Sequence, residues 1–177
     1  MTAHGHHNSR PRLHATLLGS VRIGVGNRVI GDDAWSLRSA RALLLLLLIT
    51  PGHAMASERV RDILWPEASP DVGRNALYKA LHLLRRVLEP ELISARESTF
   101  IESRGGTIAI SAHVDVRVDA EAFEAALRTA MLAAGDDRRR QLRKAIALYG
   151  GELLPTDRYE DWPVARRETL RYAWEGA

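Results

Sequence analysis

Residues 71–88 read DVGRNALYKALHLLRRVL and repeat their apolar side chains with the period of an α-helix. One side of this predicted helix collects Ala76, Leu77, Ala80, Leu81, Leu83, Leu84, Val87 and Leu88. The opposite side collects Arg74, Asn75, Tyr78, Lys79, His82, Arg85 and Arg86. Ser69 is expected as the N-cap, Pro70 occupies the first helical position, and Pro90 ends the helix.

The outward side of this helix supports two interpretations. A polar face on an ordinary core helix is simply solvated, and the stretch alone does not decide against that. However, the face between Asp71 and Glu89 contains no carboxylate to balance its cations. Arg, Asn, Lys, His and Tyr are also the side chains that reach base edges and phosphates, which favours a nucleic-acid contact.

Composition limits the other functions. Residues 1–118 carry 15 basic against 11 acidic side chains, and residues 119–177 carry 10 against 11, so the basic surplus lies in the first part. The chain has no cysteine, which excludes disulfides and thiol chemistry and agrees with a reducing cytoplasm. It has no P-loop, metal-ligand cluster or nucleophile–base pair, so neither an enzyme nor a cofactor is expected.

The termini and apolar runs predict a cytoplasmic protein without a membrane anchor. No apolar stretch follows a basic start, and the run 42–49 is too short to cross a bilayer. Residues 1–12 are expected to be a disordered tail, and its His4, His6 and His7 are not assigned a metal.

The region 14–110 predicts a winged helix-turn-helix. Alternating apolar residues around a Gly26-Asn27 turn indicate a small antiparallel sheet in 14–37. Two helices follow, 36–50 capped by Ser36 and 57–65 capped by Ser57, and then the helix of 71–88. After Pro90 the period changes to two, with Leu92 and Ile93 expected to begin extended structure. Strands at 99–102 and 107–110 flank a Ser103-Arg104-Gly105-Gly106 tip, whose arginine suits a minor groove.

From Asp119 the pattern returns to helices. Asp119 is expected to cap a helix to Ala134 with Phe123, Leu127 and Met131 inward, and Gly135 to end it. A second helix, capped by Asp136 or Asp137, presents Leu142, Ile146 and Tyr149 on one stripe, and a third covers 161–174. This is about one and a half tetratricopeptide-sized pairs, which would leave an apolar side uncovered. The pattern therefore predicts either an N-terminal portion of a longer protein or a dimer.

Three runs of the sequence resemble a known family. The run ILWPEASPDVGRNALYKALHLLRRVL resembles the corresponding motif of SARP-type bacterial transcriptional activators, which begin with an OmpR-type winged helix. The runs VDAEAFEAAL, KAIALYGGELLP and YEDWPVARRETL are similar to their bacterial transcriptional activator domain. The resemblance covers residues 13–174. It implies a mainly α protein with small antiparallel sheets, in which 13–117 is the winged helix and 118–177 a tetratricopeptide-like bundle.

The resemblance also implies residue roles. Arg74, Asn75, Tyr78, Lys79, His82, Arg85 and Arg86 fall on the recognition helix, which lies in the major groove, and Arg104 falls near the wing tip. Because Arg85 and Arg86 lie far along the helix, at least one is expected to hold the DNA backbone. Pro66, Glu67, Ala68 and Ser69 match the loop that OmpR-type proteins present to RNA polymerase. The wing departs from the family pattern at Ser98-Thr99-Phe100, so its register stays open.

The prediction from the sequence is therefore a DNA-binding transcriptional activator. It would bind double-stranded DNA at direct repeats, as a homodimer, and recruit RNA polymerase, with no membrane partner. The alternative is a protein-interaction scaffold that regulates a partner or a downstream ATPase without reading DNA. The operator and the activating signal are not encoded in any pattern of the chain.

Overall fold

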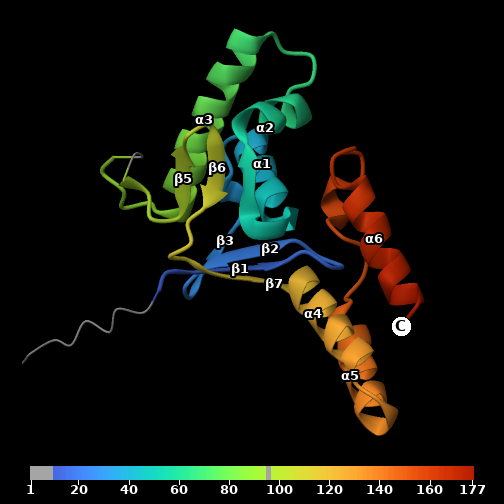
Figure 1. Ribbon diagram of the computed structural model, residues 1–177. Helices are drawn as coiled ribbons and strands as arrows, with labels where there is room; N and C mark the ends of the chain where they lie inside the picture. Colours follow the sequence, from blue (N-terminus) through green and yellow to red (C-terminus); the bar gives the residue numbers. More distant parts are fainter. Residues whose placement is uncertain (1–9, 95–96) are drawn as a thin grey trace, which may run out of the picture.

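The computed structural model describes residues 10–94 and 97–177, and within them the chain is a mixed α/β protein of six α-helices and two small sheets (Figure 1). The three histidines of the N-terminal tail lie outside the described residues. The helices and sheets share one continuous apolar core that runs from the first sheet through the central helices to the C-terminal helices.

The first sheet has the strand order β3-β2-β1-β7. Its strands are β1 (Arg12–Thr16), β2 (Arg22–Val25), β3 (Arg28–Ile30) and β7 (Asp115–Val118). The predicted Gly26-Asn27 turn joins β2 to β3, and the pairs β1–β2 and β2–β3 are antiparallel. The expectation of a wholly antiparallel sheet is wrong at one edge, because β7 pairs parallel to β1 after the chain has passed through three helices and the wing.

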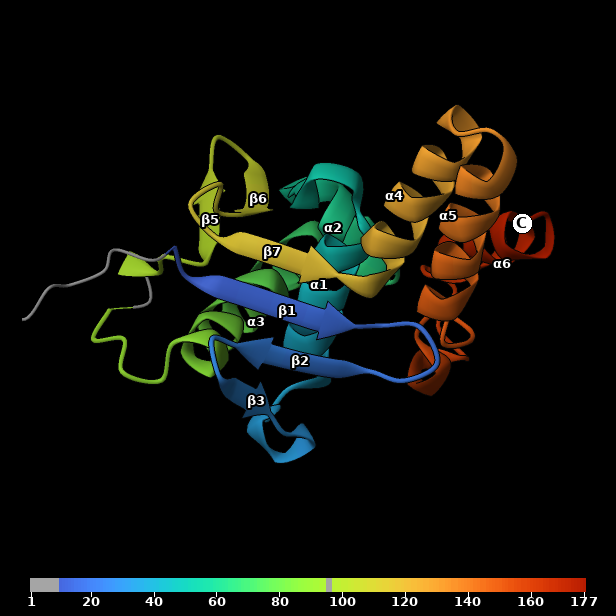
Figure 2. The ribbon, with the colours of Figure 1, turned by 90° about the horizontal axis from the view of Figure 1, so that it is seen from below.

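Three helices pack on one side of this sheet (Figure 2): α1 (Arg38–Ile49), α2 (Ser57–Leu64) and α3 (Pro70–Leu88). Residues 43–49 of α1 are all buried, so the apolar run of the sequence lies inside the core. The N-caps are Leu37 for α1 and Ala56 for α2, not the predicted Ser36 and Ser57. The helix of α3 begins as predicted, with Ser69 at the N-cap position and Pro70 first, although the Ser69 side chain makes no capping hydrogen bond.

The second sheet has the order β4-β6-β5 and forms the wing. It contains β4 (Ala54–Ala56), β5 (Ile101–Arg104) and β6 (Thr107–Ile110). The sequence did not predict β4, which leads directly into α2 and pairs with β6. Leu92 and Ile93 do not begin a strand, and the Ile93 side chain is almost fully exposed. The hairpin of residues 101–110 is confirmed, with β5 two residues further along than expected.

The C-terminal helices are α4 (Asp119–Leu132), α5 (Gly135–Leu148) and α6 (Val164–Glu175). Phe123 is fully buried, whereas Met131 and Ile146 are exposed, so the expected stripes are only partly right. The buried positions between α4 and α5 include Ala126, Ala130 and Ala145. Small side chains at these positions allow the two helices to approach closely, and the longer apolar residues beside them are turned to solvent.

Asp119 fastens these helices to the first sheet. Its Oδ1 accepts a hydrogen bond from the Leu17 amide at 2.8 Å, and its Oδ2 accepts one from the Leu18 amide at 3.0 Å. Val118 is the N-cap of α4, so the predicted capping role of Asp119 is replaced by this link to the end of β1. Burial raises the pKa of the Asp119 carboxyl, although the amide donors oppose that shift.

The arrangement leaves one end of the molecule open. Both views place α3 and the wing on the side of α1 away from α6 (Figures 1 and 2). The outward side of α3 and the tip of the wing are therefore uncovered by the C-terminal helices.

No helix in the described part of the chain is both long and apolar enough to cross a membrane.

Candidate DNA-binding surface

The position of α3 is set by its buried side and by contacts at its C-terminus. Leu77, Leu81, Leu84 and Leu88 lie in the core. At the C-terminus the Arg28 side chain from β3 donates hydrogen bonds to the carbonyls of Val87 and Leu88, at 2.9 and 2.8 Å. A cation at this end of a helix satisfies carbonyls that lack an intrahelical partner and opposes the helix dipole. The sheet thereby holds the helix in register.

Most of the predicted site residues on α3 are exposed on its outward side: Arg74, Asn75, Tyr78, Lys79, His82 and Arg86. Arg74 makes an ion pair of 3.2 Å with Asp71 one turn earlier. Such exposed pairs contribute little free energy, so this contact can be exchanged for another anion. The solvent side of α3 thus presents a row of donors, as the sequence predicts.

Arg85 differs from its neighbours. Its Nε donates to the Ile101 carbonyl of β5 at 3.2 Å, and its side chain is only half exposed. Burial lowers the pKa of this guanidinium, while nearby Glu89 acts in the opposite direction. In this structure Arg85 joins α3 to the wing, and Arg86 is the one of the two that faces solvent.

The wing tip is built on two glycines. Gly105 and Gly106 have φ angles of 58° and 76°, which are accessible to glycine without steric cost and reverse the chain between β5 and β6. The Gly106 carbonyl accepts a hydrogen bond of 2.7 Å from the Ser57 amide at the start of α2. Arg104 ends β5 beside this turn and is exposed. The wing is thus joined to the helix-turn-helix through α2 as well as through β4.

The wing and the helices enclose a shared groove of about 340 Å³. It is lined by Ser57, Arg61, Arg74, Leu77, Tyr78, Leu81, Ser103, Arg104, Gly105 and Gly106. The structure therefore brings together Arg74 and Tyr78 from α3 with Arg104 from the wing. It also adds Arg61 of α2, which sequence reasoning missed, because helical spacing places that residue on α2 but cannot reveal what α2 faces.

The loop between α2 and α3 lies next to this surface along the chain. Pro66, Glu67 and Ser69 are exposed, and Ala68 is half-buried because its methyl group approaches Gly73 of α3. The loop is short and bounded by Pro66 and Pro70, which limits its backbone freedom. Three of its four residues are therefore accessible from solvent.

The chemistry available on this surface is that of binding. Three guanidinium groups around one groove and a row of donors along α3 can neutralise phosphates and donate to base edges. Within residues 10–94 and 97–177 no group of three or more His, Cys, Asp or Glu side chains is placed to hold a metal ion. The arrangement of helix, helix and winged hairpin is the one used by winged-helix proteins.

Comparisons with known proteins identify a fold. No family model matches the sequence, and no curated protein matches it either. Among solved structures the chain is similar to Mycobacterium tuberculosis EmbR in complex with a low-affinity phosphopeptide, with a TM-score of 0.70 and 18% sequence identity. The match covers 93% of this chain and 43% of that chain. The chain thus shares the fold of EmbR over nearly its whole length and spans less than half of that protein.

Proposed function

We propose that the chain binds double-stranded DNA, with α3 in the major groove and the wing at the adjacent minor groove or backbone. The observation that carries the proposal is the groove where Arg74 of α3, Arg61 of α2 and Arg104 of the wing converge. Three arginines from three elements around one groove are suited to contact neighbouring phosphates. The outward side of α3 continues this surface with Asn75, Lys79 and His82, which have the donor chemistry to read bases.

The roles along α3 divide by position. Arg74, Asn75, Tyr78, Lys79 and His82 lie on the second to fourth turns of α3 and are proposed to meet base edges and nearby phosphates. Arg86 lies one turn beyond His82 and is proposed to hold the backbone. Arg85 is proposed to act indirectly, because its Nε already bonds to β5 and so fixes the wing relative to the helix.

We further propose that the protein is a transcriptional activator of the SARP type. The sequence motifs resemble that family, and the fold likeness over 93% of the chain is compatible with it. In this proposal the loop 66–69 contacts RNA polymerase, and α4 to α6 form the start of a tetratricopeptide-like activator domain. Binding to direct repeats as a homodimer belongs to the same proposal.

The salt dependence of binding to a duplex tests the proposal. If about five basic groups contact phosphate, the logarithm of the association constant falls with the logarithm of salt concentration at a slope of roughly −4 to −5. Fluorescence anisotropy with a labelled duplex pool, at salt concentrations from about 50 to about 200 mM, measures the slope. Binding that is absent or independent of salt would contradict the proposal.

A protein-interaction scaffold is the second candidate. It is favoured by three largely exposed side chains of α4 and α6, those of Met131, Leu132 and Tyr172. A groove of about 350 Å³ lies there, lined mainly by apolar groups of α4, α5 and α6. Replacing Arg74 and Lys79 by Ala separates the candidates, because a scaffold would keep its partner while a DNA-binding protein would lose its duplex.

A further inference from the structure

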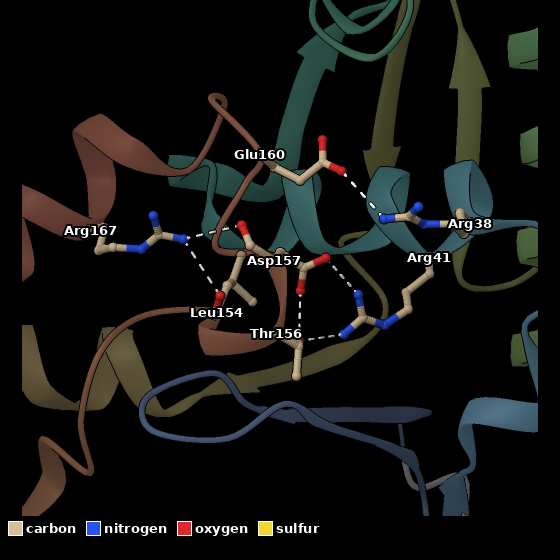
Figure 3. Close-up of polar contacts among 7 residues, drawn as sticks. All are labelled: Arg38, Arg41, Leu154, Thr156, Asp157, Glu160 and Arg167. Atoms are coloured by element: carbon tan, nitrogen blue, oxygen red, sulfur yellow. Dashed lines mark hydrogen bonds and ion pairs between the residues drawn. The ribbon is translucent and has the colours of Figure 1, made fainter.

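The helical part is defined as α4, α5, α6 and the segment 149–163. Besides an ion pair of Glu121 with His53 at 3.4 Å, it has two larger contacts with the winged helix. The first is at the end of β1, where Asp119 binds the Leu17 and Leu18 amides and where Leu153 pairs with Leu18. The second is at the start of α1, where residues 156–160 reach Arg38 and Arg41 (Figure 3). The two places differ in what holds them together.

The contact at β1 is apolar and closely packed. Leu17, Leu153 and Leu154 are fully buried, and the Leu154 amide donates to the Leu17 carbonyl at 2.8 Å. A Cβ added at Gly19 would lie 2.2 Å from the Gly150 oxygen, so the two backbones are in direct contact. This place cannot separate without exposing core side chains, and it therefore acts as the fixed end.

The contact at α1 is made by charged side-chain tips. Arg41 donates to an Asp157 carboxylate oxygen at 2.7 Å and to the Thr156 hydroxyl at 3.1 Å. The side chains of Arg41 and Asp157 are 19% and 11% exposed. Arg38 and Glu160 lie 3.7 Å apart at the rim, where the Arg38 side chain is 96% exposed. A cavity of about 540 Å³ separates the rest of α1 from residues 156–160.

The charges at this contact complement each other. The first turn of α1 has no acidic residue and no side-chain cap, and it contains arginines, which the helix dipole disfavours there. Asp157 and Glu160 supply the negative charge that this helix end lacks. The Arg41–Asp157 ion pair is thus favourable both for the helix end and for the carboxylate, and it is made by polar side-chain atoms.

The segment that carries Asp157 is held from the other side by α6. Arg167 donates to the Leu153 carbonyl at 3.0 Å and approaches the carbonyls of Leu154 and Asp157 at 3.5 and 3.4 Å (Figure 3). Leu154 adopts a φ of 50°, which a leucine rarely takes, and these contacts hold it there. The bidentate pair of Arg166 with Glu124 and the stacking of Tyr149 on Trp174 join α6 to α4 and α5. These contacts join the three helices and the segment 149–163 into one unit.

We propose that the helical part is hinged at residues 17–19 and 150–154 and latched to α1 by the Arg41–Asp157 pair. Closing the latch fixes the orientation of α4, α5 and α6 relative to α1 and, because α1 packs against α3, relative to the recognition helix. Opening it changes that orientation while both parts stay folded. The latch does not depend on the DNA-binding proposal, since its contacts lie on the side of α1 away from α3.

Distance measurements between the two parts test the latch. The chain has no cysteine, so Arg59→Cys on α2 and Glu168→Cys on α6 allow two spin labels to be attached at exposed positions. Pulsed electron spin resonance should give one narrow distance distribution in the otherwise wild-type protein. Arg41→Ala and Asp157→Asn should each broaden it or add a second distance, whereas the control Arg143→Ala, an exposed arginine of α5 outside this contact, should leave it unchanged.

The charge-swapped variant, Arg41→Asp with Asp157→Arg, should restore the narrow distribution. A distribution in Arg41→Ala that equals that of Arg143→Ala would overturn the latch. Loss of the circular dichroism of the whole chain in either single variant would also overturn it, because the pair would then belong to the core. A swapped variant that stays as broad as the single variants would assign the effect to lost packing and would count against the proposal equally.

Discussion

The outward sides of α3 and α5 are both basic, but they differ in their surroundings. The helix α5 carries five basic side chains, Arg138, Arg139, Arg140, Arg143 and Lys144, and all five are exposed. By density of charge it exceeds α3. However, Asp136 and Asp137 pair with Arg139 and Arg140 at 3.3 and 2.7 Å, so part of this charge is balanced within the helix itself.

The helix α3 has fewer cations but better surroundings. No carboxylate interrupts its outward side between Asp71 and Glu89, and the wing and α2 bring Arg104 and Arg61 beside Arg74. Under the proposed function, the number of basic residues on a helix is a poor guide to where DNA binds. The convergence of cations from separate elements on one groove is the better one.

The largest expected effect separates the two helices directly. Arg74→Ala with Lys79→Ala should weaken binding to a selected duplex on the order of 100-fold, because base and phosphate contacts each contribute about 1–3 kcal/mol. The matched control on α5, Arg143→Ala with Lys144→Ala, removes the same charge and should change affinity less than about threefold, through long-range attraction only. Fluorescence anisotropy measures both. Equal losses in the two double variants would show that net charge alone governs binding.

The next effect concerns the wing. Arg104→Ala should weaken binding about tenfold and reduce the steepness of the salt slope by roughly one, because one phosphate neighbour is lost. Glu102→Gln on the same strand serves as the control, since it should leave the slope unchanged or make binding slightly tighter. A salt slope that is the same in Arg104→Ala and wild type would remove the wing from the DNA contact.

A smaller effect is expected on stability. Arg28→Ala removes the two hydrogen bonds to the C-terminal carbonyls of α3 and should lower the free energy of unfolding by about 1 kcal/mol. Urea denaturation measures it, with exposed Arg22→Ala on the neighbouring strand as the control. Hydrogen exchange should accelerate in the last turn of α3 more than in α5. A uniform change along the chain would argue against a local capping role.

The smallest effect contrasts two carboxyl groups at the sheet. Burial raises the pKa of Asp119, so its contribution to stability is fully present below the ordinary aspartate pKa of about 3.9 and is lost as pH rises through the raised value. Hydrogen bonds from Arg117, with help from Arg12, lower the pKa of Asp115, so its contribution is present above pH 3.9 and lost as pH falls. The stability difference between wild type and Asp119→Asn should therefore shrink with rising pH, and that for Asp115→Asn should grow. Urea denaturation from pH 3 to 6, roughly the span that brackets the ordinary value, measures both. The same trend in both would refute the two assignments.

The sequence predicted those features that depend on neighbours along the chain. The bounds of α3 follow from Ser69, Pro70 and Pro90, and the buried run of α1 follows from its leucines. The hairpin of the wing follows from its glycines, and the exposed donors of α3 follow from helical period.

The features that depend on distant partners could not be predicted. The strands β4 and β7 have three and four residues, and each is defined by a strand far away in the chain. Arg28 and Arg61 look like ordinary surface residues until the fold brings them to α3. Met131 is exposed while its neighbour Ala130 is buried, and periodicity alone does not choose between the two.

Selection of bound duplexes from a random pool tests the central claim most directly. The wild-type protein and the Arg74→Ala, Lys79→Ala variant should be carried through the same rounds, with the α5 double variant as the control. The account predicts that the wild type and the α5 variant enrich one shared motif, repeated in tandem, and that the α3 variant enriches none. Failure of the wild type to enrich a motif, or enrichment of the same motif by the α3 variant, would contradict it.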